Sequence, residues 1–253
     1  MVTGLLLAVV GLTAVWAGGW WFTGLVVLIV AVLVWELARM LGADQRRALI
    51  LGGLAAAAIG AGKLLSLAAL PGLALPFLLL VAIAGIAVLE RNRTVYILMI
   101  TVILLAGFGL ILHRDEFGLP WMLWLVLVVA VTDILGYFAG RVFGGPKFWP
   151  RVSPKKTWSG TVAGWVGAAI VGWGFMGLSG AGVELIGVSV ALSMASQMGD
   201  IAESAVKRRM GVKDSSNLLP GHGGVYDRFD GLLGATFLLV MVESFTAFPP
   251  PPV

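Results

Sequence analysis

Long, uninterrupted apolar runs dominate the chain, and polar residues gather in the segments between them. A run such as LVVLIVAVLV, residues 25–34, is apolar on every side, whereas the strands of an outer-membrane barrel alternate apolar and polar residues. A membrane-spanning helix needs about 20 predominantly apolar residues. The pattern therefore predicts an all-α, polytopic integral membrane protein.

The apolar runs predict about nine transmembrane helices. We expect them near residues 3–18, 20–38, 48–70, 72–89, 95–112, 119–138, 158–178, 182–199 and 231–248. The composition agrees, because a mean hydropathy of +1.00 leaves too few polar groups to cover a soluble globule. We expect no cleavable signal peptide, and the absence of cysteine excludes thiolate metal sites and cysteine nucleophiles.

Basic residues partition sharply between alternate loops of this arrangement. The loops after the second, fourth, sixth and eighth runs hold all but two of the 17 lysines and arginines; Lys63 lies inside the third run and Arg114 lies on the other side. By the positive-inside rule, these four loops face the cytoplasm. We therefore expect the N-terminus inside and the C-terminal end outside.

Polar chemistry is concentrated in the second half of the chain. Residues 1–115 predict an N-terminal transmembrane scaffold of about five spans, with His113 in a loop on the non-cytoplasmic face. Residues 116–253 predict a catalytic transmembrane region with long cytoplasmic loops at 139–157 and 200–230. An active site at the cytoplasmic face is expected there.

Two features of the sixth and seventh runs are candidates for the site. Asp133 lies deep in the sixth run, where an ionisable group is costly and faces a cavity or a partner; it either pairs with a basic side chain or contacts substrate. In RVSPKKTWSGT, the lysines Lys155 and Lys156 precede a predicted helix start at Thr157. Such a start suits a phosphate group, although the segment alone would also fit a positive-inside anchor.

The end of the eighth run aligns an acid, a hydroxyl and a cation. If the helix continues past the membrane, Asp200, Ser204 and Lys207 share one face at i, i+4 and i+7. An ordinary surface helix also has such a pattern. The chemistry that follows in the sequence is therefore needed to separate the two interpretations.

The stretch LLPGHGGVYDRFDG follows, with glycines on both sides of His222. Glycines let backbone N–H groups approach an anion closely. Asp227 and Asp230 come next, three residues apart, and Asp230 could alternatively cap the ninth helix. With Asp200 they form a set of acids without soft ligands, which favours a hard cation such as Mg²⁺.

The segment SAVKRRMGVKDSSNLLPGHGGVYDRFD, residues 204–230, resembles the signature of the phosphatidate cytidylyltransferases, or CDP-diacylglycerol synthases. That signature reads S-x-x-K-R, four residues, K-D, a loop ending in H-G-G, and D-R-x-D, and every fixed position matches. TDILGYFAGRVFG and SPKKTW are also similar to the family, so the resemblance covers roughly residues 120–248. The chain departs from the family at Ser159, where Glu is usual, and at Gly231, where Ser is common.

The resemblance implies an enzyme of a bacterial cytoplasmic membrane that joins CTP and phosphatidate, with Mg²⁺, to give CDP-diacylglycerol and pyrophosphate. The expected partners are these substrates and the lipid bilayer, not nucleic acid. Because the attacking phosphate oxygen is already anionic, positioning and charge neutralisation must supply the catalysis.

We expect Asp200 and Asp227 to hold Mg²⁺, with Asp230 nearby or structural. Cationic and histidine side chains would act on phosphates: Lys207, Arg208, Lys213, His222 and Arg228. Further substrate contacts are expected from Asp133, Ser153, Lys155, Lys156, Thr157, Ser204 and the backbone of Gly221, Gly223 and Gly224, with Asp214 as an orienting residue.

Two other functions remain open at this point. A transporter or an anionic-lipid-binding scaffold would also carry basic loops, but a transport path should place polar residues through the depth of several spans. A cytidylyltransferase acting on a different lipid phosphate is the other alternative. Glycine-rich spans such as GTVAGWVGAA suit packing within the chain or against a second copy, which leaves a homodimer open.

Overall fold

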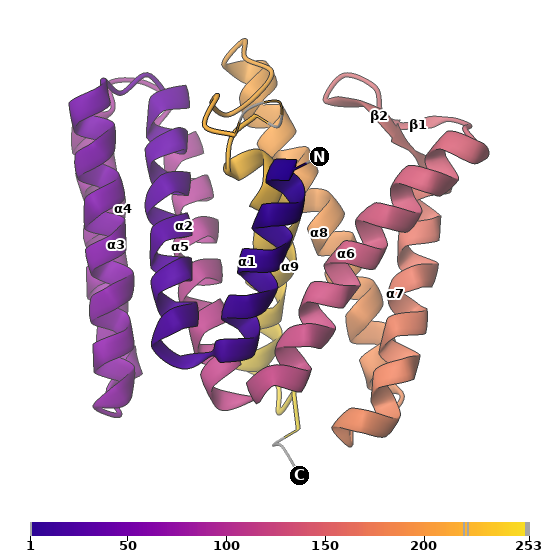
Figure 1. The fold of residues 1–253 in the computed structure, drawn as a ribbon. Coiled ribbons are helices and arrows are strands. Elements are labelled where there is room, and N and C mark those ends of the chain that lie inside the picture. Colours follow the sequence, from indigo (N-terminus) through magenta and orange to yellow (C-terminus); the bar gives the residue numbers. More distant parts are fainter. Residues whose placement is uncertain (1, 220, 222, 251–253) are drawn as a thin grey trace. The chain divides into compact units, whose positions relative to one another are not determined.

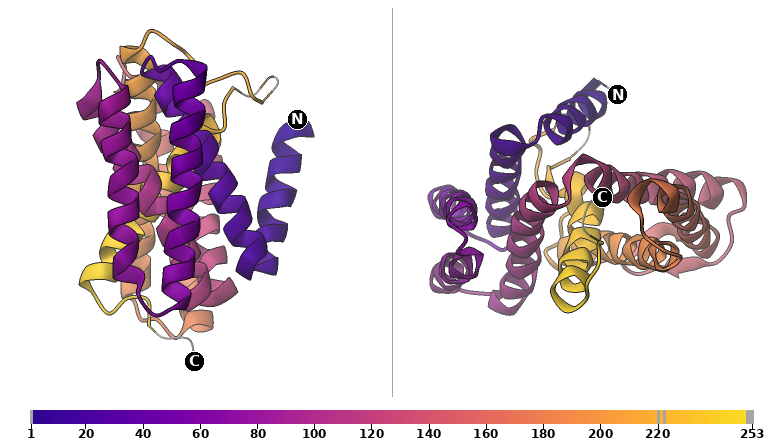
Figure 2. Two further views of the ribbon diagram at one scale, coloured as in Figure 1. Left: turned by 90° about the vertical axis from the view of Figure 1, so that its left-hand side faces the viewer. Right: turned by 90° about the horizontal axis from the view of Figure 1, so that it is seen from below.

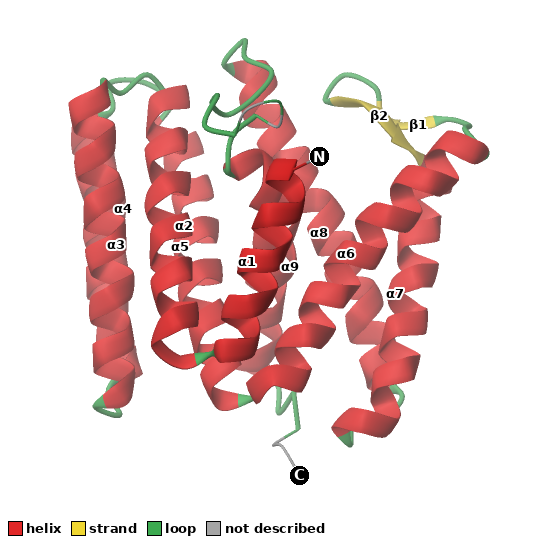
Figure 3. Cartoon of the chain, in the orientation of Figure 1, coloured by secondary structure: helices red, strands yellow, loops and turns green. Residues whose placement is uncertain are grey.

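The computed structural model describes residues 2–219, 221 and 223–250 of the chain, and most of them are helical (Figures 1 and 3). The helices in this part of the chain are α1 (Val2–Ala17), α2 (Gly19–Met40), α3 (Gln45–Leu67), α4 (Ala74–Val88), α5 (Arg93–Glu116), α6 (Gly118–Val142), α7 (Trp158–Ser179), α8 (Glu184–Arg209) and α9 (Tyr226–Phe245), with a short 3-10 helix at Pro71–Leu73. Each predicted apolar run corresponds to one of these helices.

Six of the described helices are long and apolar enough to cross a membrane: α2, α3, α5, α6, α7 and α8. Two shorter apolar helices are Leu6–Ala17, within α1, and α4. Large apolar side chains such as Trp21, Leu79 and Trp173 are exposed, as expected where lipid replaces water around a helix. The predicted class, a helical and polytopic membrane protein, is confirmed.

The predicted cytoplasmic loops are shorter and more ordered than expected. α8 continues to Arg209, beyond the apolar run, and α9 begins at Tyr226 instead of near residue 231. Between α6 and α7, strands β1 (Lys147–Trp149) and β2 (Ser153–Thr157) form an antiparallel hairpin (Figure 3). The apolar-run pattern did not predict these strands because they are short and about half of their residues are exposed.

The chain forms two compact units. Unit 1 comprises residues 1–115 and 209–229, and unit 2 comprises residues 116–208 and 230–253. Within unit 1, α3 packs against α2 and α4; within unit 2, α6 packs along α7 (Figure 2). Residues 209–229, which carry much of the signature, thus belong with the N-terminal helices.

One end of unit 1 contains a partly buried ion pair. Lys63 of α3 pairs with Asp115 of α5 and lies 5.9 Å from the centre of the Trp20 ring. His113, expected in a loop, lies instead within α5 and is buried. The prediction was wrong because α5 runs on through its polar end to Glu116, so its last turns are packed within the unit.

Candidate active site

The predicted site residues are divided between the two units. Unit 1 contains Lys213, Asp214, Gly221, Gly223, Gly224, Asp227 and Arg228. Unit 2 contains Asp133, Ser153, Lys155, Lys156, Thr157, Asp200, Ser204, Lys207, Arg208 and Asp230. His222 lies outside the described residues.

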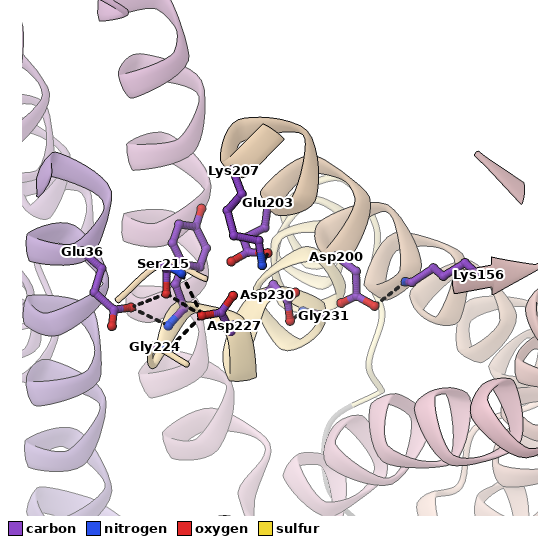
Figure 4. A network of polar contacts seen from close by, with 11 residues as sticks. Glu36, Lys156, Asp200, Glu203, Lys207, Ser215, Gly224, Asp227, Asp230 and Gly231 are labelled. Atoms are coloured by element: carbon purple, nitrogen blue, oxygen red, sulfur yellow. Dashed lines mark hydrogen bonds and ion pairs between the residues drawn. The ribbon is translucent and has the colours of Figure 1, made fainter. Parts of the chain in front are cut away.

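The hairpin and α8 meet through an ion pair in unit 2. Lys156 of β2 pairs with Oδ2 of Asp200, and its Nζ also lies 3.5 Å from the carbonyl oxygen of Gln197 (Figure 4). Both side chains are partly shielded from solvent, with 27% and 19% of their surface exposed. Partial burial strengthens such a charge-assisted contact relative to a surface pair. Two residues far apart in the sequence are thereby brought to one place.

Further charges surround Asp200 in the same unit. Asp230, at the start of α9, interacts with Asp200 and lies in the field of Glu203, and Glu203 pairs with Lys207 one turn further along α8. Three carboxylates therefore face two ammonium groups. The excess of negative charge suits a cation, because close carboxylates repel one another unless a positive charge lies near them.

Glycines allow α8 and α9 to cross closely at this cluster. A Cβ atom built on Gly199 would lie 2.3 Å from the carbonyl oxygen of Asp230, and one on Gly234 would lie 2.3 Å from that of Ala195. Both contacts are with backbone, so only glycine fits without moving a helix. Gly231, where the family commonly has Ser, lies at the same crossing: a Cβ there would be 3.0 Å from Oδ1 of Asp200.

A cavity of about 370 Å³ opens beside the Lys156–Asp200 pair, within the roughly 300–1,000 Å³ typical of small-molecule sites. Its walls come from α6, the hairpin, α7 and α8, and include Asp133, Arg141, Lys155, Lys156, Thr157 and Asp200. Four predicted site residues besides Asp200 thus line one cavity: Asp133, Lys155, Lys156 and Thr157. The cavity was not foreseeable from spacing, since it forms only where these four elements meet.

The hairpin is fixed to the start of α7. The Thr157 hydroxyl accepts a hydrogen bond from the Gly160 N–H at 3.2 Å, so Thr157 is the N-cap of α7. Ser159, where the family usually has Glu, donates its hydroxyl proton to the carbonyl oxygen of Gly144. Thr157 therefore both caps α7 and lines the cavity. Ser159, where the family usually has an acid, links the start of α7 to the residues before the hairpin.

In unit 1, Asp227 organises the loop before α9. We call residues 213–225 the signature loop. Oδ2 of Asp227 accepts hydrogen bonds from the Ser215 N–H at 2.9 Å, the Ser215 hydroxyl at 2.9 Å and the Gly224 N–H at 2.7 Å (Figure 4). The Gly224 N–H, expected to cradle a phosphate oxygen, is thus donated to Asp227.

A second acid, Glu36 of α2, contacts the same loop. Its carboxylate accepts hydrogen bonds from the hydroxyls of Ser215 and Ser216 and from the N–H groups of Val225 and Tyr226, the last at 2.6 Å. Glu36 is completely buried. The sequence analysis treated this helix as scaffold and did not single out Glu36.

Most of the remaining candidates lie at the surface. Lys213, Asp214, Arg208 and Arg228 are exposed, and Ser204 is half-buried on α8. Glu203 was also missed by the sequence analysis, although its spacing of i, i+4 from Lys207 was a usable signal. Glu36 offered no such signal, because its partners lie about 180 to 190 residues away along the chain.

Oxygen donors suited to Mg²⁺ are present, but they do not form a closed cage. Within the described part of either unit, no three His, Asp or Glu side chains form a group arranged to hold one metal ion. Mg²⁺ is usually held by one or two carboxylates together with waters and substrate phosphates. The Asp200 and Asp230 carboxylates in unit 2 fit that pattern.

The sequence matches a known family. The model of the cytidylyltransferase family matches residues 1–245. The chain belongs to this family. The match includes the N-terminal helices as well as the signature, and so covers both units.

Three curated relatives carry the name phosphatidate cytidylyltransferase. The chain is 48% identical to the one from Brucella suis over 58% of this chain and 57% of the relative. It is 37% identical to the one from Staphylococcus saprophyticus over 64% of each, and 38% identical to the one from Bacillus subtilis over 53% of this chain and 51% of the relative. The aligned part thus spans less than two thirds of each relative's length.

Proposed function

We propose that the protein is a CTP:phosphatidate cytidylyltransferase. In this reaction, a phosphate oxygen of phosphatidate attacks the α-phosphorus of CTP, a new P–O bond forms, and the bond to the β-phosphate oxygen breaks to release pyrophosphate. The products are CDP-diacylglycerol and pyrophosphate. The observation that carries the proposal is the cavity of unit 2, lined by Lys155, Lys156 and Asp200, in a chain of this family.

The cavity residues suit the charge problem of this reaction. Several negative charges meet when a nucleoside triphosphate approaches a phosphomonoester, and catalysis requires that their repulsion be offset. In the proposed site, Lys156 moves its ammonium group from Asp200 toward a phosphate, while Lys155 and Arg141 attract the anion from the exposed rim. Lys207 and Arg208 extend the positive charge along α8.

Asp200 and Asp230, both in unit 2, are the proposed ligands of Mg²⁺. Asp227, predicted as a ligand together with Asp200, belongs to unit 1, where its Oδ2 accepts three hydrogen bonds. When bound, the ion would neutralise charge on the triphosphate. The protein's own contribution is to hold the Asp200 and Asp230 carboxylates close together across the α8–α9 crossing.

We further propose nine membrane spans with the N-terminus and the active site in the cytoplasm. The distribution of the lysines and arginines supports this topology. A reporter that works only in the cytoplasm should be active when fused after Lys156 and inactive when fused after Val253. The reverse pattern would overturn the topology.

The direct test is turnover by the purified full chain in detergent. With labelled CTP, phosphatidate and Mg²⁺, we expect labelled CDP-diacylglycerol and an equal amount of pyrophosphate. Diacylglycerol, which lacks the attacking phosphate, is the control and should give no product. Folded protein that transfers CMP to another lipid phosphate but not to phosphatidate would change the substrate, and transfer to neither would overturn the proposal.

A further inference from the structure

A buried carboxylate of α2, Glu36, accepts hydrogen bonds from the signature loop. Glu36 lies near the end of α2, a helix apolar enough to span a membrane, and is completely buried. A buried ionised carboxylate is costly unless hydrogen bonds compensate it. Among the described residues, its four donors are neutral: two serine hydroxyls and two backbone N–H groups. These hydrogen bonds offset the cost of burying the charge.

Two of these donors belong to the start of α9. The first N–H groups of a helix lack partners within the helix, and an anion beside them is favoured by the helix dipole. Glu36 accepts from Val225 at 2.9 Å and from Tyr226 at 2.6 Å. It therefore acts as the N-terminal cap of α9, supplied by a different helix.

Ser215 connects this cap to Asp227. Its hydroxyl lies 3.2 Å from Oε2 of Glu36 and 2.9 Å from Oδ2 of Asp227, and its N–H also donates to Asp227. A hydroxyl has one proton, so the two carboxylates share a single donor. The position of Glu36 therefore influences the position of Asp227, a predicted metal ligand, through Ser215.

Gly224 makes room for the connection. A Cβ atom at Gly224 would lie 2.0 Å from the Ser215 hydroxyl oxygen and 2.4 Å from Oε1 of Glu36. The second glycine of the His-Gly-Gly motif is thus required by the close approach of Glu36 and Ser215. This explains the glycine independently of any phosphate contact.

We infer that Glu36 is a positioning residue for Asp227: it closes the signature loop against α2, caps α9 and fixes the orientation of the Asp227 carboxylate. Its geometry rests on unit 1 alone, whereas its consequence for catalysis rests on the proposed function. No contact of Glu36 with substrate is required.

Hydrogen exchange of the full chain in detergent tests the geometry without using activity. In Glu36→Gln, an NH₂ group replaces one acceptor oxygen and faces N–H or O–H donors, so the amides of Ser215, Gly224, Val225 and Tyr226 should exchange at least about tenfold faster. Ser216→Ala removes one donor at a half-buried position and should give a smaller rise in the same peptides. Glu90→Gln, an exposed acid of unit 1, is the matched control and should change nothing.

Turnover then tests positioning. For Glu36→Gln we expect kcat/KM for CTP to fall about tenfold or more, while KM for phosphatidate stays within about twofold, because the loop bears on Asp227 and not on the hairpin lysines. Unchanged exchange in Glu36→Gln overturns the inference, as does a uniform rise throughout unit 1. If Glu36→Gln does not fold, Ser216→Ala decides by the same criteria.

The two proposals fail in different ways. Faster exchange in the loop, together with a wild-type protein that does not use phosphatidate, leaves Glu36 as the anchor of the loop and refutes the proposed function. Unchanged exchange in Glu36→Gln, together with wild-type protein that converts phosphatidate, refutes the role of Glu36 and leaves the proposed function standing.

Discussion

The two units both bury carboxylates, but they compensate them in different ways. In unit 1, Glu36 and Asp227 accept hydrogen bonds from serine hydroxyls and backbone N–H groups. In unit 2, Asp200 and Glu203 are paired with lysines, and the Lys156–Asp200 pair borders a cavity. The carboxylates of unit 1 are compensated by neutral hydrogen-bond donors, and those of unit 2 by lysine ammonium groups.

The two kinds of contact suit different tasks: hydrogen bonds fix the path of the chain, whereas ion pairs can be exchanged for the charges of a ligand. Hydrogen bonds to backbone N–H groups are directional and fix the path of the chain. An ion pair beside a cavity can instead be exchanged for the charges of a ligand, since a lysine has several rotatable bonds and no fixed geometry. Unit 1 is therefore suited to holding the signature loop, and unit 2 to meeting phosphates.

Asp200→Asn should have the largest effect on turnover. It removes the partner of Lys156 and one acid of the cluster, and we expect kcat to fall by about 10²–10³, as for other preorganised charged groups in active sites. Glu184→Gln, at the other end of α8, is the control and should retain normal CDP-diacylglycerol synthesis. Near-normal turnover in Asp200→Asn would place the chemistry outside the unit 2 cluster.

Lys156→Ala should follow, with a loss of about tenfold to a hundredfold, because a charge-assisted contact contributes about 1.5–3 kcal/mol. Lys155→Ala, its exposed neighbour on the cavity rim, should lose only a few-fold, and that loss should shrink at high salt as exposed charges are screened. Steady-state kinetics at two ionic strengths checks both. Equal losses in the two variants would contradict the special position of Lys156.

Gly199→Ala tests whether the acid cluster depends on the helix crossing. Its Cβ would lie 2.3 Å from the Asp230 carbonyl oxygen, so the helices must separate, at a cost of about 1–3 kcal/mol and about tenfold in turnover. Gly187→Ala, on the same helix with nothing within 4 Å of its Cβ, should be neutral or stabilising. Thermal unfolding in detergent measures both variants, and similar melting temperatures would refute the close crossing.

The smallest change in turnover is expected from Lys63→Gln, which breaks the partly buried Lys63–Asp115 pair of unit 1. The loss of its pairing with Asp115 should cost about 1–3 kcal/mol of stability and lower the melting temperature, with turnover within about twofold. Lys155→Gln, an exposed lysine, serves as the stability control. A large loss of activity at unchanged stability would mean that this end of unit 1 takes part in function.

Much of the architecture followed from apolar length alone. Each predicted run became a helix, because about 20 apolar residues in lipid leave the helix as the way to satisfy the backbone. The extension of α8 to Arg209 meets the condition under which Asp200, Ser204 and Lys207 share one helix face. The hairpin was not anticipated, because strands of three and five residues carry too little periodicity to be recognised.

The candidate site was predicted by residue type and only partly by position. Asp200, the signature residue Asp227 and the loop lysines were singled out from the sequence, since acids and cations are rare in an apolar chain. Their partners were not: nothing local marks Glu36, within WELARM, as the cap of a helix that begins at Tyr226.

The sequence by itself determined the helical class, the charge distribution and the family resemblance, because each depends on composition or on contiguous residues. Only the tertiary structure decided that Lys156 pairs with Asp200, that α8 and α9 cross at glycine, and that Glu36 closes the signature loop. Those contacts join residues that are distant along the chain, and they depend on where helix backbones approach within a few ångströms. The pattern of apolar and polar residues along the sequence does not specify these distances between helices.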